Sequence, residues 1–170
     1  MTALPVENDL MQASQNIGLP IEREYRMAHE EIDALLNAVL PLAQQMLGKY
    51  GEFYPIGASI SATGEVGLVG VMPESEHPEA QEIIDLLMAQ LVHDAGTHEI
   101  RGSVICFDGT AVSPGQSDKS DAICAHLEHE SGICVAAFLP YRKEISGQVT
   151  YGELFAGQLK PQIFVSGIPS

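Results

Sequence analysis

The sequence predicts an α+β fold of two layers, in which two main helices pack on an antiparallel sheet of about five strands. Two long segments repeat apolar residues at steps of three and four, which indicates helices with one apolar stripe each. Shorter segments alternate apolar and polar residues between glycine-containing turns, which is typical of strands. The predicted order is helix, two strands, helix and three strands. Helices that each bury one stripe against one face of such a sheet give this architecture.

The first helix is expected to run from Glu24 to either Gly48 or Gly51, because glycine favours the left-handed conformation that ends helices. Pro41 removes one hydrogen bond inside this helix and is expected to kink it near Asn37. The predicted apolar stripe contains Ile32, Leu35, Leu36, Val39, Leu40, Ala43, Met46 and Leu47.

Residues 60–70, with the sequence ISATGEVGLVG, predict a β-hairpin. A three-residue turn at residues 62–64, with Gly64 left-handed, keeps the apolar side chains on one face, whereas a slip of one residue would expose them. The predicted pairs are Ile60 with Val66 and Ala58 with Leu68. Glycine weakens a strand unless another segment approaches closely. We therefore expect a packed helix, or more rarely a ligand, near Gly57, Gly67 and Gly70.

A second helix is expected to open at His77 and Pro78, since proline suits the first turn of a helix, and to end at Gly96. Its predicted apolar face contains Ala80, Ile83, Ile84, Leu87, Met88, Leu91 and Val92. Strands are expected over residues 100–107, 122–129 and 133–141, and residues 148–155 are a candidate for a final strand.

Residues 21–170 are predicted to form one α+β domain, with residues 1–20 as an N-terminal extension, because no linker or repeat divides the 170 residues. No apolar stretch approaches the roughly 20 residues of a membrane-spanning helix, and the first residues lack the basic and apolar regions of a signal peptide. Three cysteines without paired spacing are expected to be reduced thiols. We therefore expect a cytoplasmic protein with no membrane partner.

Charge is the clearest compositional signal, because 8 Lys and Arg against 23 Asp and Glu give a net charge of −15. No Lys or Arg lies between Lys49 and Arg101. An acidic surface repels phosphate backbones, so nucleic-acid binding is disfavoured. Solubility alone would explain this charge, and the alternative is attraction of a basic protein partner. The predicted partner-binding residues, around the start of the second helix, are Glu76, Glu79, Glu82 and Asp85.

His93, Asp94 and His98 form a cluster near the end of the second helix. Gly96 is expected to end the helix before His98, so the spacing of a helical zinc site is not met. Histidine is favoured at a helix C-terminus by the helix dipole, which explains these residues more simply. We expect neither a metal ion nor a cofactor.

Pairing across a turn at Ser131 and Gly132 predicts that two strands share one partly apolar face. This face, predicted to bind a dimer partner or a ligand, carries Cys124, His126, Val135, Ala137 and Leu139. Covering by the N-terminal segment or by the tail is the alternative. The opposite face, predicted to be the core surface, carries Ile123, Ala125, Leu127, Ala136 and Phe138. A thiol beside an imidazole is the arrangement of cysteine nucleophiles, but free cysteine is more often a core residue, so no catalytic residue is predicted.

Arg142 follows Pro140 and Tyr141 at the end of a predicted strand. Its guanidinium group could clamp the carboxylate of a ligand with two hydrogen bonds. A neighbouring Asp or Glu is the alternative acceptor in so acidic a chain. The sequence has no GxGxxG, P-loop, GxSxG or HExxH motif, so no common enzyme class is indicated.

Two resemblances accompany these patterns. The order of elements from Glu24 to Phe155 resembles the roadblock and profilin-like group, in which helices flank a five-stranded antiparallel sheet. The sequences GEFYPIGASISATGEVGLVG and FLPYRKE resemble a family of small bacterial proteins with a GEFYPFG-like hairpin. Neither resemblance implies an activity or a functional residue, because fold alone does not give function.

Two functional hypotheses follow. The first is a non-enzymatic protein, expected to be dimeric, that binds a basic protein partner in a regulatory or antitoxin-like and immunity-like role. The second is a small-molecule sensor or enzyme with a pocket between the hairpin, from Gly57 to Gly70, and the helices.

Overall fold

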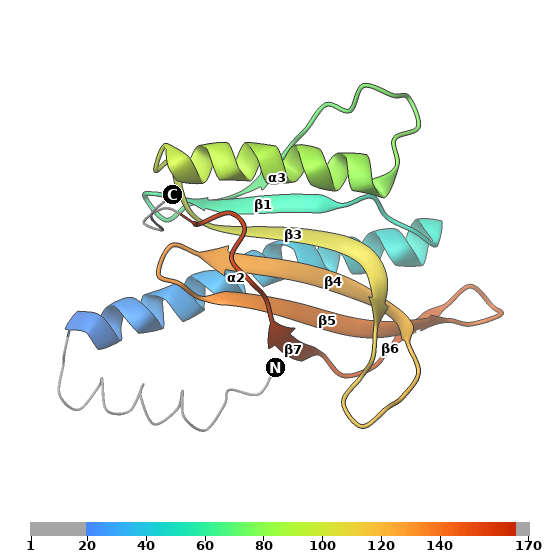
Figure 1. The fold of residues 1–170 in the computed structure, drawn as a ribbon. Helices are drawn as coiled ribbons and strands as arrows, with labels where there is room; N and C mark the ends of the chain where they lie inside the picture. The colour runs from blue at the N-terminus through green and yellow to red at the C-terminus, as the bar shows by residue number, and fades with distance from the viewer. Residues whose placement is uncertain (1–19, 166–170) are drawn as a thin grey trace.

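The computed structural model describes residues 20–165 of the chain. In order along the sequence, the elements are α2 (Pro20–Tyr50), β1 (Ile56–Ser61), β2 (Val66–Val69), α3 (Ala80–Gly96), β3 (Ile100–Ala111), β4 (Ser120–His129), β5 (Cys134–Lys143), β6 (Val149–Tyr151) and β7 (Phe155–Gln158) (Figure 1). The predicted N-terminal extension, apart from residue 20, lies outside the described residues. Among those described, no helix has the length and hydropathy needed to cross a membrane.

The strands form one antiparallel sheet of seven strands, in the order β2-β1-β3-β4-β5-β6. The last two strands both pair with β5: β6 lies beside its C-terminal part and β7 beside its N-terminal part. The single final strand expected over residues 148–155 is therefore two short strands. An α+β fold with an antiparallel sheet is confirmed, with more strands than predicted.

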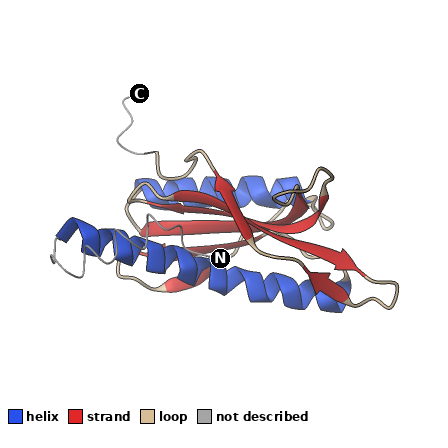
Figure 2. Ribbon diagram, turned by 90° about the horizontal axis from the view of Figure 1, so that it is seen from below, coloured by secondary structure: helices blue, strands red, loops and turns tan. Residues whose placement is uncertain are grey.

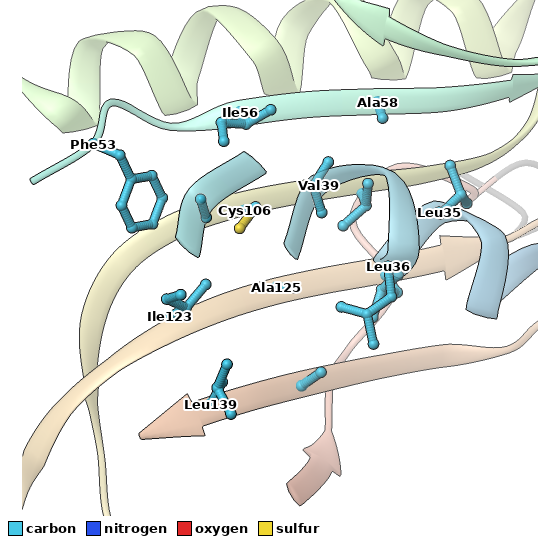
Figure 3. Close-up of a cluster of buried hydrophobic side chains, with 14 of the residues drawn as sticks. Leu35, Leu36, Val39, Phe53, Ile56, Ala58, Cys106, Ile123, Ala125 and Leu139 are labelled. Carbon is cyan, nitrogen blue, oxygen red and sulfur yellow. The ribbon is translucent and has the colours of Figure 1, made fainter. Parts of the chain in front are cut away.

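The two helices lie on opposite faces of the sheet, so the prediction of two layers is wrong (Figure 2). α2 crosses one face, where side chains such as Leu35 and Val39 pack over β1, β3 and β4 (Figure 3). α3 packs on the other face through Ile83, Leu87, Leu91 and Ala95. The physical reason is that β3 is apolar on both sides: Val104 and Cys106 belong to the α2 core, and Ile105 belongs to the α3 core.

α2 begins at Pro20, four residues before the predicted start, and continues through Pro41. Gly51, with φ of +76°, ends the helix, and its N–H donates to the Leu47 carbonyl oxygen at 2.9 Å. This is the left-handed glycine cap that the sequence predicts at one of two positions.

The first hairpin has the predicted register, with Ile60 opposite Val66 and Ala58 opposite Leu68. Gly64 has φ of +94°, as its turn requires. A Cβ atom on Gly57 would lie 2.6 Å from Leu87 Cδ2, so the close approach of α3 explains this glycine. Cβ atoms on Gly67 and Gly70 would meet no atom within 4 Å, so no close approach explains those two.

The second hairpin, β4–β5, differs from its predicted register by one residue. Leu127 pairs with Val135 and Glu128 pairs with Cys134, whereas the sequence predicted Glu128 opposite Val135. The His129 N–H donates to the Ile133 carbonyl oxygen at 2.9 Å, which encloses a three-residue turn, residues 130–132, in place of the expected two-residue turn. This difference changes which β5 side chains share a face with β4.

Candidate functional site

The predicted partner-binding residues lie in the segment before α3 and in its first turns. Glu79 is the N-cap residue of α3, with no side-chain hydrogen bond to the helix. The Glu82 carboxylate accepts a hydrogen bond from Ser75 Oγ at 3.0 Å, and Asp85 accepts one from Gln81 Nε2 at 2.9 Å. Across residues 20–165, neither these carboxylates nor that of Glu76 is paired with a cation. The positive end of the α3 dipole favours the negative charge of Glu79 and Glu82.

A groove of about 520 Å³ lies beside this acidic surface. One wall is the outer side of α3, including Leu86 and Ala89, and the other is the chain that leaves β2, including Val71 and Met72. Met72 is 90% exposed, and Leu68 of the adjoining edge strand is 62% exposed. Large apolar side chains at such exposure, gathered at one edge of the sheet, are typical of surfaces that bind other proteins.

The predicted dimer or ligand face does not exist as one face. Because of the three-residue turn, Val135, Ala137 and Leu139 lie on the α2 side of the sheet, where Ala137 and Leu139 are buried in the main core. Cys124 and His126 lie on the opposite side, together with Ala136 and Phe138, which the sequence assigned to the core surface. The prediction for this site is wrong in its β5 half.

Cys124 and His126 are not arranged as a nucleophile and its base. Burial raises the pKa of the Cys124 thiol to about 11, and the thiol donates to the Ala122 carbonyl oxygen, which lies 3.7 Å from Sγ. Burial also lowers the pKa of His126, whose ring packs edge-on against Phe107 at 5.0 Å. Both groups are therefore neutral near pH 7, as in a packed interior.

The chain after β7 covers part of this same face, which was the alternative that the sequence left open for it. Figure 1 shows this segment crossing the sheet from β7 towards β3. Glu128, only 3% exposed, accepts hydrogen bonds on Oε1 from the backbone N–H groups of Gln162 and Ile163, both at 2.9 Å. Ile163 then packs into the α3 core. The sequence gives no local signal for this contact, which joins residues 35 positions apart.

A second polar cluster, also missed by the sequence interpretation, joins α2 to two strands. Glu31 of α2 accepts hydrogen bonds from Arg101 Nε at 2.9 and 3.0 Å, and its carboxylate also pairs with the Arg101 Nη2 group. His129 Nε2 lies 2.8 Å from Glu31 Oε1. Burial alone would raise the pKa of Glu31, but the hydrogen bonds from Arg101 and His129 outweigh burial and hold this pKa below its ordinary value.

This cluster borders a hollow of about 530 Å³ and contains a hydroxyl, an imidazole and a carboxylate in series. Ser131 Oγ lies 2.9 Å from His129 Nδ1, and the Ser131 backbone N–H donates to the same Nδ1 at 3.0 Å. The lone pair that a general base would need is thus already engaged, and Arg101 neutralises Glu31. We interpret these side chains as a clamp that fixes the turn of residues 130–132 to α2.

The remaining candidate residues lie in two separate places, at the end of α3 and at the end of β5. His93 Nδ1 lies 3.2 Å from Asp94 Oδ1, and His98 follows α3 with φ of +61°. In the described part of the chain, no group of three His, Cys, Asp or Glu residues could hold a metal ion. Arg142 lines a different hollow, at the far end of β5 from the turn of residues 130–132.

Comparison with known proteins adds no relative to this description: no family model, no curated protein and no solved structure matches the chain.

Proposed function

We propose that this protein is a non-enzymatic binding protein whose groove beside α3 receives a basic segment of another protein. The observation that carries the proposal is a mainly apolar groove, bordered by Met72 and Leu86, beside the carboxylates of Glu79 and Asp85, which form no ion pair within residues 20–165. Protein interfaces commonly have this anatomy, with apolar contacts at the centre and polar groups around them.

Charge supports a basic partner over an acidic or neutral one. The chain from Glu52 to Glu99 contains nine carboxylates and no Lys or Arg, so no cation of that segment competes for the carboxylates of α3. Complementary charge raises the rate of association and selects among partners, and the apolar contacts retain the partner once it is bound. Regulatory binding and an antitoxin-like or immunity-like role both use such a surface.

Homodimerisation is a separate proposal, because the face on which the sequence placed it does not exist. Light scattering of the full chain at two protein concentrations tests it directly. A dimer that forms would have to use a surface other than Ala137 and Leu139, which are buried beneath α2.

The test of the proposed function is affinity capture from lysate, followed by reconstitution with the identified partner. We expect binding at roughly 50 mM salt that weakens steeply by roughly 500 mM, because screening acts on exposed charges. The triple variant Glu79→Gln, Glu82→Gln, Asp85→Asn should weaken the affinity by about tenfold or more. Met72→Glu should also weaken it, by placing a charge in the apolar groove.

A control variant removes the same number of charges elsewhere: Asp33→Asn, Glu52→Gln and Glu153→Gln, all exposed. If this control weakens the affinity as much as the α3 variant, binding responds to net charge alone and the groove is not the site. If no partner is retained at low salt, the proposed function is wrong.

The second candidate function is binding of a small molecule, in a smaller region than the one that the sequence suggested. The space between the hairpin and α3 is filled at Gly57 by Leu87, and the groove reaches the hairpin segment only at Gly70. A metabolite bound there should raise the melting temperature to the same extent at low and high salt, whereas a charge-driven protein partner should not.

A further inference from the structure

A separate hollow of about 560 Å³ lies between the loop that precedes β4 and the ends of β5 and β6. In Figure 1 this is the region between the loop that follows the curved end of β3 and the β5–β6 hairpin. Sites for small molecules have volumes of roughly 300–1,000 Å³, so the size suits a metabolite. The hollow lies at the opposite end of β5 from the cluster around Glu31.

The floor of this hollow is held in place by buried and hydrogen-bonded groups. Tyr141 is 6% exposed, and its hydroxyl donates to Asp108 Oδ1 at 2.6 Å. Tyr151 pairs with Tyr141 across β5 and β6, and the Gly152 N–H extends the pairing to the Pro140 carbonyl oxygen at 2.8 Å. A ligand would therefore meet a surface that is already formed, which lowers the entropy cost of binding.

Two of the eight cations of the chain, Lys119 and Arg142, line this one hollow. Neither side chain forms an ion pair or a hydrogen bond within residues 20–165, although acidic residues are abundant. The lining contains one carboxylate, Asp118, and the nearby Glu144 accepts a hydrogen bond from Thr150 Oγ1 at 3.2 Å. The lining thus carries two positive charges and one negative charge, on a chain whose net charge is −15.

We propose that this hollow binds the phosphate group of a small phosphorylated metabolite. A phosphomonoester carries a charge of about −1.5 to −2 near pH 7. Two cations balance this charge more closely than they balance the single negative charge of a carboxylate. Arg142 can place two parallel N–H donors on phosphate oxygens, while Lys119 supplies a compact charge. Ser113 lines the same space, and its hydroxyl group can donate to a remaining oxygen.

The organic part of the ligand lies against the ring of Tyr151, which also lines the hollow. A polynucleotide would have to approach a protein of net charge −15 over a long distance, so a small monoester is favoured over a nucleic acid. This site is distinct from the groove beside α3, and the proposed protein binding does not depend on it.

Titration of the full chain with glucose 6-phosphate, followed by backbone amide NMR, tests the proposal. We expect saturable shifts confined to the amides of residues 113, 115–120, 141–142 and 150–152, with a dissociation constant below about 1 mM. Inorganic phosphate should shift the same amides more weakly, and glucose should not shift them. Lys119→Gln and Arg142→Gln should each weaken binding by about tenfold or more.

Lys143→Gln is the matched control, since it removes one positive charge from the neighbouring position, which does not line the hollow. Its affinity for glucose 6-phosphate should stay within about twofold of the original, because exposed charges outside the site are screened. Lys119, Arg142 and Lys143 are all exposed, so thermal melting should show that all three variants fold. The proposal is overturned if neither phosphate probe binds below about 10 mM, or if Lys143→Gln weakens binding as much as Arg142→Gln. Equal binding of succinate would overturn the assignment to phosphate.

Discussion

The hairpins β1–β2 and β4–β5 turn at the same end of the sheet and use the same backbone geometry. Each has a three-residue turn closed by a backbone hydrogen bond, of 2.8 Å from the Ser61 N–H and 2.9 Å from the His129 N–H. In each the third turn residue is glycine, with φ of +94° at Gly64 and +103° at Gly132. The two turns therefore need the same conformational freedom from glycine.

They differ in the side chains that hold them. In the first turn, at the sheet edge, Ser61 Oγ accepts the Glu65 N–H at 3.0 Å, and Arg101 Nη1 donates to the Ala62 carbonyl oxygen at 2.9 Å. In the second turn, His129 contacts Ser131 within the turn and Glu31 on α2. The edge turn is thus held by local contacts and by Arg101 of the neighbouring strand β3, whereas the second turn is tied to the helix α2. Arg101 joins the two systems, because the same guanidinium group binds Glu31.

The largest effect should come from Glu31→Gln, since Glu31 is the carboxylate on which both turns depend. The substitution removes the charge that pairs with the partly buried Arg101 and weakens the acceptor for His129. We expect a loss of about 2–3 kcal/mol in the free energy of unfolding, measured by urea denaturation. Glu30→Gln changes the exposed neighbouring residue and should cost less than about 0.5 kcal/mol. Equal losses in the two variants would contradict the role of Glu31.

Comparison of the original protein with Glu31→Gln also gives a prediction about the effect of pH on stability. Although burial opposes it, hydrogen bonding holds the folded-state pKa of Glu31 below its ordinary value of 4.5. The charged carboxylate therefore stabilises the fold above pH 4.5, and this contribution is lost as the pH falls through the folded-state pKa. The difference in unfolding free energy between the original protein and Glu31→Gln should shrink as the pH falls below about 4.5. A difference that grows below this pH would reverse the assigned sign.

The two hairpins also show what the sequence could predict. Strand β2 exposes its side chains while β1 is buried, so in the first hairpin only one register keeps Ala58 and Ile60 inside. In the second hairpin both faces of β4 and β5 are largely apolar, so alternation does not distinguish registers one residue apart. The signal in the sequence that favours the observed register is Gly132. As the third residue of a three-residue turn, it would match Gly64 of the first turn.

The incorrect prediction that both helices lie on one face of the sheet has a related cause. Residues 102–106 of β3 are small or apolar at every position and are all buried, which is typical of a strand covered on both faces. The cluster of Glu31, Arg101 and His129 could not be predicted for a different reason. Glu31 lies 70 positions from Arg101 and 98 from His129 in the sequence, and no local spacing relates them. Arg101 is the one cation of its strand and indicates an acidic partner, but not which of the 23 acidic residues it is.

Substitution of the turn glycines, Gly64 and Gly132, should cause losses of stability of intermediate size that differ between the two turns. Gly132→Ala places a Cβ atom in open space, so its cost is that of the left-handed backbone, about 1–2 kcal/mol. Gly64→Ala pays the same cost, and its Cβ atom would also lie 3.1 Å from Arg101 Nη2, which Glu31 holds in place. We expect Gly64→Ala to be the more destabilising in urea denaturation. In the Glu31→Gln background the two should become nearly equal, and a gap that persists there would show that Arg101 is not the cause.

The smallest effects should come from the serine beside each turn. Ser61→Ala leaves the Glu65 N–H without its acceptor and should cost about 0.5–1 kcal/mol. Ser131→Ala should cost less, because the Ser131 backbone N–H still donates to His129 Nδ1 after the hydroxyl is removed. Thermal melting compares the two directly. A larger loss for Ser131→Ala would mean that its hydroxyl, and not the backbone N–H, holds the imidazole in the turn clamp.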